Sequence, residues 1–152
     1  MKKKIYIYSS ILFLIDLISK LLVIKYIDKL TIIPNFLALE LVYNDGVAFS
    51  LLKGQQLLII LISVIVLIYI LKKIVPTIKK RTETISISLL LGGLLGNLFD
   101  RILYNEVIDF ISFKIFNYYF PIFNLADTFI CIGVFILLIL MIKDGKNENR
   151  SK

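Results

Sequence analysis

The sequence predicts a mainly α-helical, polytopic membrane protein with four transmembrane helices, a small extracytoplasmic β-hairpin and both termini in the cytoplasm. Three observations support this fold class. The 152-residue chain is 59% hydrophobic with a mean hydropathy of +0.89, more apolar surface than a soluble domain of this size can bury. Four apolar stretches approach the roughly 20 residues that span a bilayer. Basic residues gather in clusters outside those stretches.

The four predicted helices cover about residues 6–27, 55–73, 84–103 and 124–142. The first follows three lysines, as the apolar part of a signal peptide would. However, it contains Asp16 and Lys20 and lacks a small-residue cleavage site, so we expect it to be retained. The second is short, and the glutamines and lysines at its ends can mark its interfaces or snorkel to them.

The basic residues predict the orientation of the chain. Twelve of the 18 lysines and arginines lie in segments 2–4, 72–81 and 143–152. With four spans, these segments share one side of the membrane, which the positive-inside rule makes cytoplasmic. The net charge of +7 therefore comes largely from basic clusters that lie next to membrane lipids. We expect no nucleic-acid partner.

Two segments are therefore expected on the outer side. In the region of about 31–52, β-prone runs at 36–43 and 47–52 flank Asp45-Gly46, a tight-turn signal, and predict a hairpin. An irregular interfacial loop is the alternative. The segment of about 104–122 is expected to be a loop with seven aromatic residues. These residues suit the headgroup zone or a cover over a lipid-bearing substrate.

The first helix carries two charges at membrane depth. Asp16 and Lys20 are four residues apart and hence lie on one helix face. Charged groups inside a membrane are costly and usually face a polar interior. We favour an ion pair that fixes this helix to its neighbours over a direct chemical role.

The third helix ends in GGLLGNLFDR, which places a small and polar stripe on one face. Gly93, Gly96, Asn97 and Asp100 follow the spacing i, i+3, i+4, i+7. Small residues allow helices to approach closely in membranes. We expect Asn97, Asp100 and Arg101 to form a hydrogen-bonded network that supports neighbouring groups.

Two more carboxylates, Asp109 in VIDF and Asp127 in FNLAD, are expected at the outer ends of the last two helices. Asn124 is a favoured N-cap residue that would place Asp127 at N3, so a capping carboxylate is one interpretation. The other is a pair that shares one proton, activates water and protonates a leaving amine. In that pair the helix N-terminus favours ionised Asp127 as base, and apolar surroundings favour protonated Asp109 as acid.

Other classes of site find little support. The chain has no histidine, which removes the usual zinc sites, Ser-His-Asp triads and Cys-His dyads. No P-loop or GxGxxG pattern occurs, and we expect neither a cofactor nor a metal. A small proton-coupled carrier is the alternative function, but it would favour midplane charges and internal repeats. A structural or holin-like protein would not need so many polar blocks.

Five blocks carry a family resemblance. They are DLISK at 16–20, NDGVAFS at 44–50, GGLLGNLFDR at 92–101, VIDF at 107–110 and FNLAD at 123–127. In this order and over nearly the whole chain, the sequence resembles the bacterial lipoprotein signal peptidases (signal peptidase II). The resemblance implies a membrane aspartyl endopeptidase that cleaves prolipoproteins before their diacylglyceryl-modified cysteine. It also implies a single domain over residues 1–152 in the bacterial plasma membrane, with its active site near the extracytoplasmic face. We expect a monomer.

The resemblance also implies residue roles. Asp109 and Asp127 match the catalytic aspartates of the family. The supporting or substrate-binding residues that it implies are Asp16, Lys20, Asn44, Gly46, Ala48, Gly93, Gly96, Asn97, Asp100, Arg101, Asn124 and Ala126. In this interpretation the outer hairpin cradles the precursor, the 104–122 loop closes over the cleavage site, and Asn44 and Arg101 orient the substrate backbone.

Overall fold

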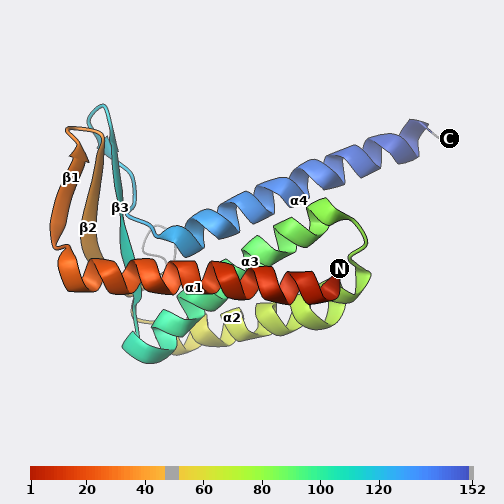
Figure 1. Cartoon of the computed structure of the whole chain (residues 1–152), viewed down its shortest axis with the longest axis horizontal. Coiled ribbons are helices and arrows are strands. Elements are labelled where there is room, and N and C mark those ends of the chain that lie inside the picture. Colours follow the sequence, from red (N-terminus) through yellow and green to blue (C-terminus); the bar gives the residue numbers. More distant parts are fainter. Residues whose placement is uncertain (47–51, 151–152) are drawn as a thin grey trace.

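The structure, a computed structural model, describes residues 1–46 and 52–150, with side chains as far as residue 143. Its long helices are α1 (Lys2–Tyr26), α2 (Gln56–Tyr69), α3 (Arg81–Tyr104) and α4 (Leu125–Arg150) (Figure 1). A π-helical segment (Ile70–Ile74) and a 3-10 turn (Val75–Thr77) extend α2. Within the described residues, four helices are long and apolar enough to cross a membrane. The predicted mainly helical class with four spans is confirmed.

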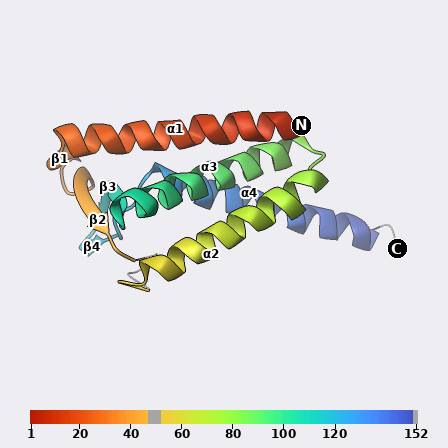
Figure 2. The same cartoon turned by 90° about the horizontal axis from the view of Figure 1, so that it is seen from below.

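Helix α3 lies among the other three helices (Figure 2). It buries a larger share of its residues than any other span, and small side chains make this possible. Gly92 is one example, since a Cβ at this position would lie 2.7 Å from Leu12 Cβ of α1. Towards α4, the buried Ser86 hydroxyl of α3 donates to the Gly133 carbonyl at 2.7 Å. Small residues at such interfaces let helix backbones approach closely.

The apolar core occupies the end of the bundle where α1 and α3 begin. It consists of Ile5, Ile70, Val75, Ile78, Ile87 and Leu91. The sheet lies across the opposite end of the helices, and the two chain termini lie away from it (Figure 1). The buried charged side chains of α1 and α3, which are Asp16, Lys20, Asp100 and Arg101, lie towards the sheet end of the bundle.

The sheet is antiparallel and has the order β1-β2-β3-β4. Its strands are β1 (Lys29–Ile33), β2 (Leu37–Asn44), β3 (Val107–Ile115) and β4 (Tyr118–Tyr119). The β2–β3 pairing places Val42 opposite Asp109 and Asn44 opposite Val107. This pairing brings residues 37–44 and 107–113 together at one end of the helices.

A hairpin is present, and β1 and β2 form it in the described part of the chain. Strand β2 agrees with the predicted run at 36–43, and its two neighbours in the sheet are β1 and β3. The turn of this hairpin lies at residues 34–36, where Asn35 has a φ of 59° and Phe36 N–H donates to the Ile33 carbonyl at 3.1 Å. The hairpin predicted about Asp45-Gly46 needs the run at 47–52, of which residues 47–51 lie outside the described residues.

The predicted loop at 104–122 is also wrong in part, because it contains strands β3 and β4. Asn105, with a φ of 62°, ends α3 in the left-handed conformation that asparagine tolerates. The chain then turns directly into β3. Asp109 consequently lies on a strand, instead of at the end of a helix as the sequence suggested.

Candidate functional site

Lys20 is the centre of a buried ion cluster between α1 and α3. Its ammonium lies 2.7 Å from Asp16 Oδ2 and 2.7 Å from Asp100 Oδ2, and all three side chains are at most 1% exposed. The expected Asp16–Lys20 ion pair is thus present, with Asp100 as a second acidic partner. Such a cluster is tolerated in a low-dielectric interior only because each charge has close partners.

The two carboxylates of this cluster also bind backbone groups of other elements. Asp16 Oδ1 accepts the Ala126 N–H of α4 at 2.8 Å, and Asp100 Oδ2 accepts the Ile108 N–H of β3 at 3.2 Å. The cluster therefore fixes the start of α4 and the start of β3 against α1 and α3. The contribution of Ile108 is made by its backbone, which no side-chain pattern in the sequence could indicate.

Gly93 and Gly96 allow α4 and α1 to approach α3 at this level. A Cβ at Gly93 would overlap the Ala126 carbonyl oxygen, and one at Gly96 would overlap the Asp16 carboxylate. Ala126 itself is fully buried. The predicted stripe of α3 therefore faces the site, and its small residues leave room for the polar ones.

Asn124 and Asp127 form the predicted N-terminal cap of α4. Helix α4 begins at Leu125, so Asn124 is the N-cap residue and Asp127 occupies N3. Asn124 Oδ1 accepts the Asp127 N–H at 2.8 Å, and the Asn124 N–H donates to Asp127 Oδ2 at 3.3 Å. This reciprocal arrangement satisfies two backbone donors and orients the Asp127 carboxylate.

Asp109 lies on β3 and is 2% exposed. Asn44 Nδ2 donates to its Oδ2 at 2.8 Å, and Asn124 Nδ2 donates to its Oδ1 at 2.8 Å. The pKa of Asp109 is raised to about 7, chiefly by burial; the Asn44 hydrogen bond opposes this rise and the Asp127 charge contributes to it. Asp109 can therefore bind and release a proton near neutral pH.

Asn97 and Asn124 connect the two aspartates. Asn97 Nδ2 donates to Asp127 Oδ1 at 2.7 Å, while its Oδ1 accepts from Asn124 Nδ2 at 3.0 Å. Asn124 thus contacts Asp109 through its side chain and Asp127 through its cap. The structure brings the two carboxylates, 18 residues apart in the chain, into one hydrogen-bonded network.

Arg101 and Asn44 hold the segment that follows β2. Arg101 Nη2 donates to the Gly46 carbonyl at 2.9 Å, and the Gly46 N–H donates to Asn44 Oδ1 at 2.9 Å. Arg101 Nη1 also donates to the Asn97 carbonyl, at 3.4 Å. The expected network of Asn97, Asp100 and Arg101 therefore exists in part, since Lys20 is what joins Asn97 to Asp100. Ala48 lies outside the described residues.

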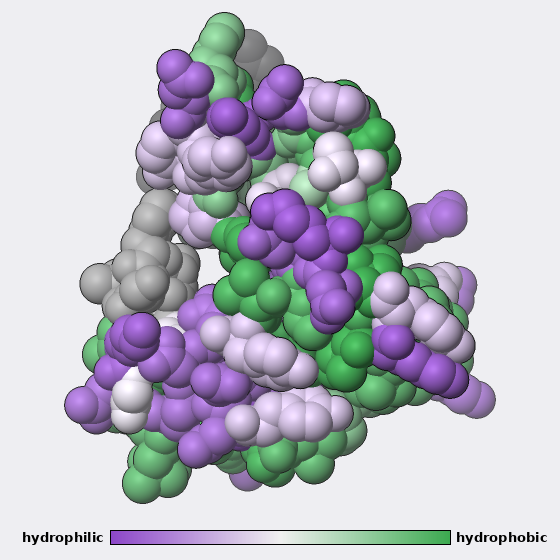
Figure 3. All heavy atoms as spheres, turned by 90° about the vertical axis from the view of Figure 1, so that its left-hand side faces the viewer, coloured by the Kyte–Doolittle hydropathy of each residue, from purple (hydrophilic) through white to green (hydrophobic). Residues whose placement is uncertain are grey.

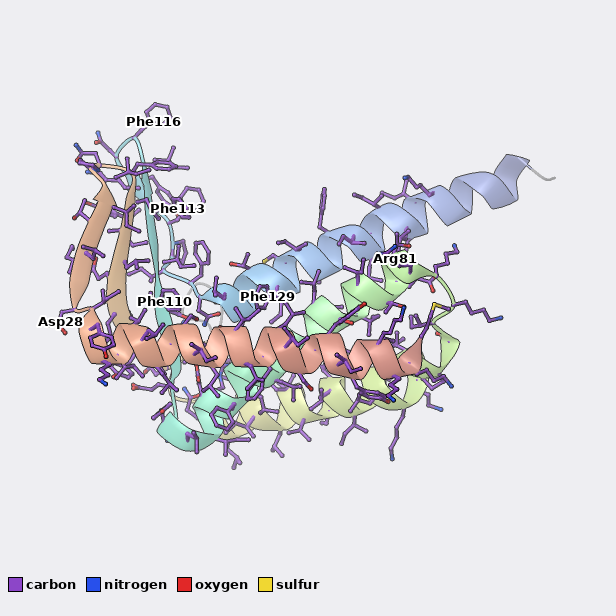
Figure 4. All side chains as sticks on the ribbon, in the orientation of Figure 1. Asp28, Arg81, Phe110, Phe113, Phe116 and Phe129 are labelled. Atoms are coloured by element: carbon purple, nitrogen blue, oxygen red, sulfur yellow. The ribbon has the colours of Figure 1, made fainter. Side chains whose placement is uncertain are left out.

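Aromatic side chains surround the sheet side of the site. Phe113 packs on Phe36 and Phe123, with ring centroids 5.3 Å and 5.9 Å away. Figure 4 shows Phe110 and Phe113 along β3 and Phe116 at the tip of the following turn, where Phe116 is 93% exposed. Seen from the sheet end, the molecule presents hydrophilic and hydrophobic side chains in alternating areas (Figure 3). Such a surface suits the boundary between water and lipid.

Within the described part of the chain, no group of three or more acidic or cysteine side chains could hold a metal ion. The arrangement instead offers two carboxylates with different surroundings. One is buried and titrates near neutrality, and the other caps a helix. Such a pair can transfer protons to and from a water molecule without a metal.

Comparison with known proteins places the chain in a family. The family model described as signal peptidase II matches residues 8–143. A lipoprotein signal peptidase of Listeria monocytogenes is 38% identical over 97% of this chain and 98% of its own length. One of Staphylococcus aureus is 37% identical over 100% and 99%.

Solved structures are similar as well. A bacterial membrane enzyme determined by the in meso method at 2.3 Å resolution has a TM-score of 0.87 and 33% identity over 94% of this chain and 90% of its own. A second, determined at 1.9 Å, has a TM-score of 0.82 and 33% identity over 92% and 93%. The similarity therefore extends over the helices and the sheet together.

Proposed function

We propose a substrate and a mechanism for this chain, which belongs to the signal peptidase II family. The chain is accordingly an aspartic-type signal peptidase and a multi-pass membrane protein. The substrate is a diacylglyceryl-modified prolipoprotein, cut on the N-terminal side of the lipidated cysteine. Asp109 and Asp127 are the catalytic pair. The observation that carries this assignment is the single side chain, Asn124, that binds Asp109 and caps the helix turn containing Asp127.

The surroundings of the two carboxylates divide their roles. Asp127 accepts hydrogen bonds on both oxygens, from Asn97 and from the Asn124 N–H, and it lies in the first turn of α4, where the helix dipole favours a negative charge. Asp127 is the base that takes a proton from water. Asp109, which burial keeps partly protonated near neutral pH, is the acid.

Proton transfer then balances over one cleavage. The water oxygen bonds to the scissile carbonyl carbon as its proton passes to Asp127, and Asp109 gives its proton to the carbonyl oxygen. When the C–N bond breaks, the amine leaves with the proton that Asp127 had taken. As that bond breaks, the hydroxyl that Asp109 had protonated returns this proton to Asp109, which leaves the new carboxylic acid and restores the starting state. The pair titrates as a unit in such a cycle.

The rest of the fold serves this reaction at the outer surface. The basic clusters orient both termini towards the cytoplasm, which places the sheet and the dyad near the extracytoplasmic face of the bacterial plasma membrane. The sheet cradles the precursor, and the aromatic residues of β3 and β4 lie over the cleavage site while the lipid tails stay in the bilayer. The whole chain acts as one integral-membrane domain and as a monomer.

In this assignment Asn44 and Arg101 act on the protein side of the site. Asn44 donates to Asp109, and Arg101 holds the Gly46 carbonyl. Both ends of the Asn44 amide are engaged in these contacts, whereas the buried Nε of Arg101 has no hydrogen-bond partner among the described residues. We therefore assign Asn44 to the shape of the site, and Arg101 to its shape and to orienting the substrate backbone.

The experiment that tests the substrate compares two forms of one precursor. The purified chain is incubated in lipid vesicles with the diacylglyceryl-modified precursor and with the same precursor lacking the lipid, and mass spectrometry locates the cut. We expect cleavage of the lipidated form only, directly before the modified cysteine. Efficient cleavage of the unmodified form, or a cut elsewhere, would overturn the proposed specificity.

A further inference from the structure

The ammonium of Lys20 has a third partner besides its two carboxylates. Its Nζ lies 3.2 Å from Asn97 Oδ1, in addition to the contacts with Asp16 and Asp100. An ammonium has three N–H donors and no acceptor, so these three partners use all of its donors. The side chain is 1% exposed, which leaves no room for water to replace one of them.

This third contact bears on the side chain that binds Asp127. Because Lys20 can only donate, it must meet the oxygen end of the Asn97 amide, and the NH2 end then faces the other way. That end donates to Asp127 Oδ1 at 2.7 Å. A reversed amide would set NH2 against an ammonium and an oxygen against a carboxylate, which is unfavourable at both ends.

Asn124 contributes to the same orientation, but without a charge. Its Nδ2 donates to Asn97 Oδ1 at 3.0 Å and to Asp109 at 2.8 Å. The positive charge of Lys20 polarises the Asn97 amide further, since hydrogen bonds in a chain strengthen one another. The chain of contacts runs from Lys20 through Asn97 to one oxygen of Asp127.

We propose that Lys20 is a positioning residue for Asp127, acting through Asn97 in addition to joining α1 to α3. This inference rests on the proposed role of Asp127 as the catalytic base. A purely structural role would need only the two carboxylates of Asp16 and Asp100, which already join α1, α3, β3 and α4. The contact with Asn97 is what extends the cluster into the site.

The test measures kcat and KM of Lys20→Met with the lipidated precursor. Methionine keeps much of the lysine shape but donates no hydrogen bond. We expect kcat to fall about 10- to 100-fold, as for loss of a hydrogen bond to a charged group, while KM stays within about threefold. An unchanged kcat in the folded variant overturns the proposal, as does a loss confined to KM.

Lys20→Met leaves two buried carboxylates without their cation and could fail to fold. A second pair of variants reduces this problem to the single carboxylate of Asp16. Asp100→Asn alone and Lys20→Met/Asp100→Asn differ only at Lys20, and the second of them has the same net cluster charge as the natural chain. The same fall in kcat is expected between these two. Equal kcat values in this pair overturn the proposal.

A double-mutant cycle separates positioning from general destabilisation. If Lys20 acts through Asn97, Lys20→Met adds less than about twofold to the kcat loss of Asn97→Ala. Full additivity of the two losses shows a separate, structural effect of Lys20 and contradicts the proposal. Ser86→Ala is the matched control, because it removes a buried α3–α4 hydrogen bond far along the helix from the site. It is expected to lower the melting temperature and leave kcat unchanged.

Asp127→Asn is measured in the same assay. If that variant keeps its activity, the proposed function of Asp127 fails, whatever Lys20 does. If Asp127→Asn is inactive but Lys20→Met keeps its kcat, only the positioning role fails.

Discussion

The hydrogen bond from Asn44 to Asp109 controls the pH range in which the acid of the pair stays protonated. Asn44 Nδ2 donates to Asp109 Oδ2 at 2.8 Å, and this contact favours the ionised carboxylate and lowers its pKa. Replacing Asn44 by alanine removes the donor. The pKa of Asp109, about 7 in the natural chain, should therefore rise.

The size of this rise follows from the contact. A hydrogen bond to a charged group contributes about 1.5–3 kcal/mol, and one pKa unit corresponds to about 1.4 kcal/mol. The expected rise is thus about one to two pH units. In the proposed mechanism the active enzyme carries a proton on Asp109, so activity is expected below this pKa and is lost as pH rises through it. The basic limb of the kcat/KM profile should move to about pH 8–9.

The assay measures the initial rate of cleavage of the lipidated precursor from about pH 5 to about pH 10, a range that extends to both sides of the expected pKa of Asp109. Asn44→Asp is the matched variant, because it keeps an oxygen to accept the Gly46 N–H but loses the donor to Asp109 and adds a negative charge. Its basic limb should move at least as far. A basic limb that stays in place, or moves to lower pH, in both variants would show that Asp109 is not the acid of the pair.

Three further predictions concern stability and the shared asparagine. Gly96→Ala should lower the melting temperature, because its Cβ would overlap the Asp16 carboxylate; overpacking typically destabilises by about 1–3 kcal/mol, and an unchanged melting temperature would contradict the close approach. Asn124→Ala should reduce kcat more than Asn44→Ala, because it removes contacts to both aspartates; steady-state kinetics with folding checked by circular dichroism decide this. Asp109→Asn should gain stability relative to the natural chain as pH rises from about 4 to about 7. In the natural chain the folded state binds the Asp109 proton more tightly than the unfolded state, so the natural chain loses stability over that window. Denaturation at several pH values would contradict this if the difference in stability between the two proteins stayed constant.

Local signals in the sequence predicted the parts of the structure that depend on local contacts. Asn124 and Asp127 are three residues apart, and their capping geometry is set within one helical turn. The stripe from Gly93 to Asp100 follows from helical periodicity alone, and it faces α1 and α4 as that periodicity indicates. Hydropathy was sufficient to predict the four spans, because helices that face lipid are apolar along their length and can be recognised without knowing how they pack.

The sheet was predicted less well because its pairing is not local. Asp45-Gly46 is a strong turn signal, yet strand β2 pairs with β1 and with a strand more than 60 residues later. Strand β3 shows no alternation of polar and apolar residues, since its first four residues are buried on both faces. A run of this kind cannot be distinguished from an aromatic interfacial loop by periodicity.

The contacts between Lys20 and Asn97 and between Asn44 and Asp109 lie at separations of 77 and 65 residues. No spacing rule joins residues so far apart, so the sequence indicated the participants and only the fold shows which atoms meet. The membrane topology allowed Asp109 and Asp127 to meet, and the family resemblance implied that they do, but no spacing within the chain required it.

Single-turnover cleavage of the lipidated precursor by Asp109→Asn and Asp127→Asn tests whether the two aspartates perform the cleavage together. Each variant keeps the size of the side chain and removes the carboxyl group. We expect both variants to bind the precursor and each to cleave it at least about 1,000-fold more slowly than the natural chain, a loss on the scale seen for essential catalytic groups. Near-natural cleavage by either folded variant would contradict the two-aspartate mechanism.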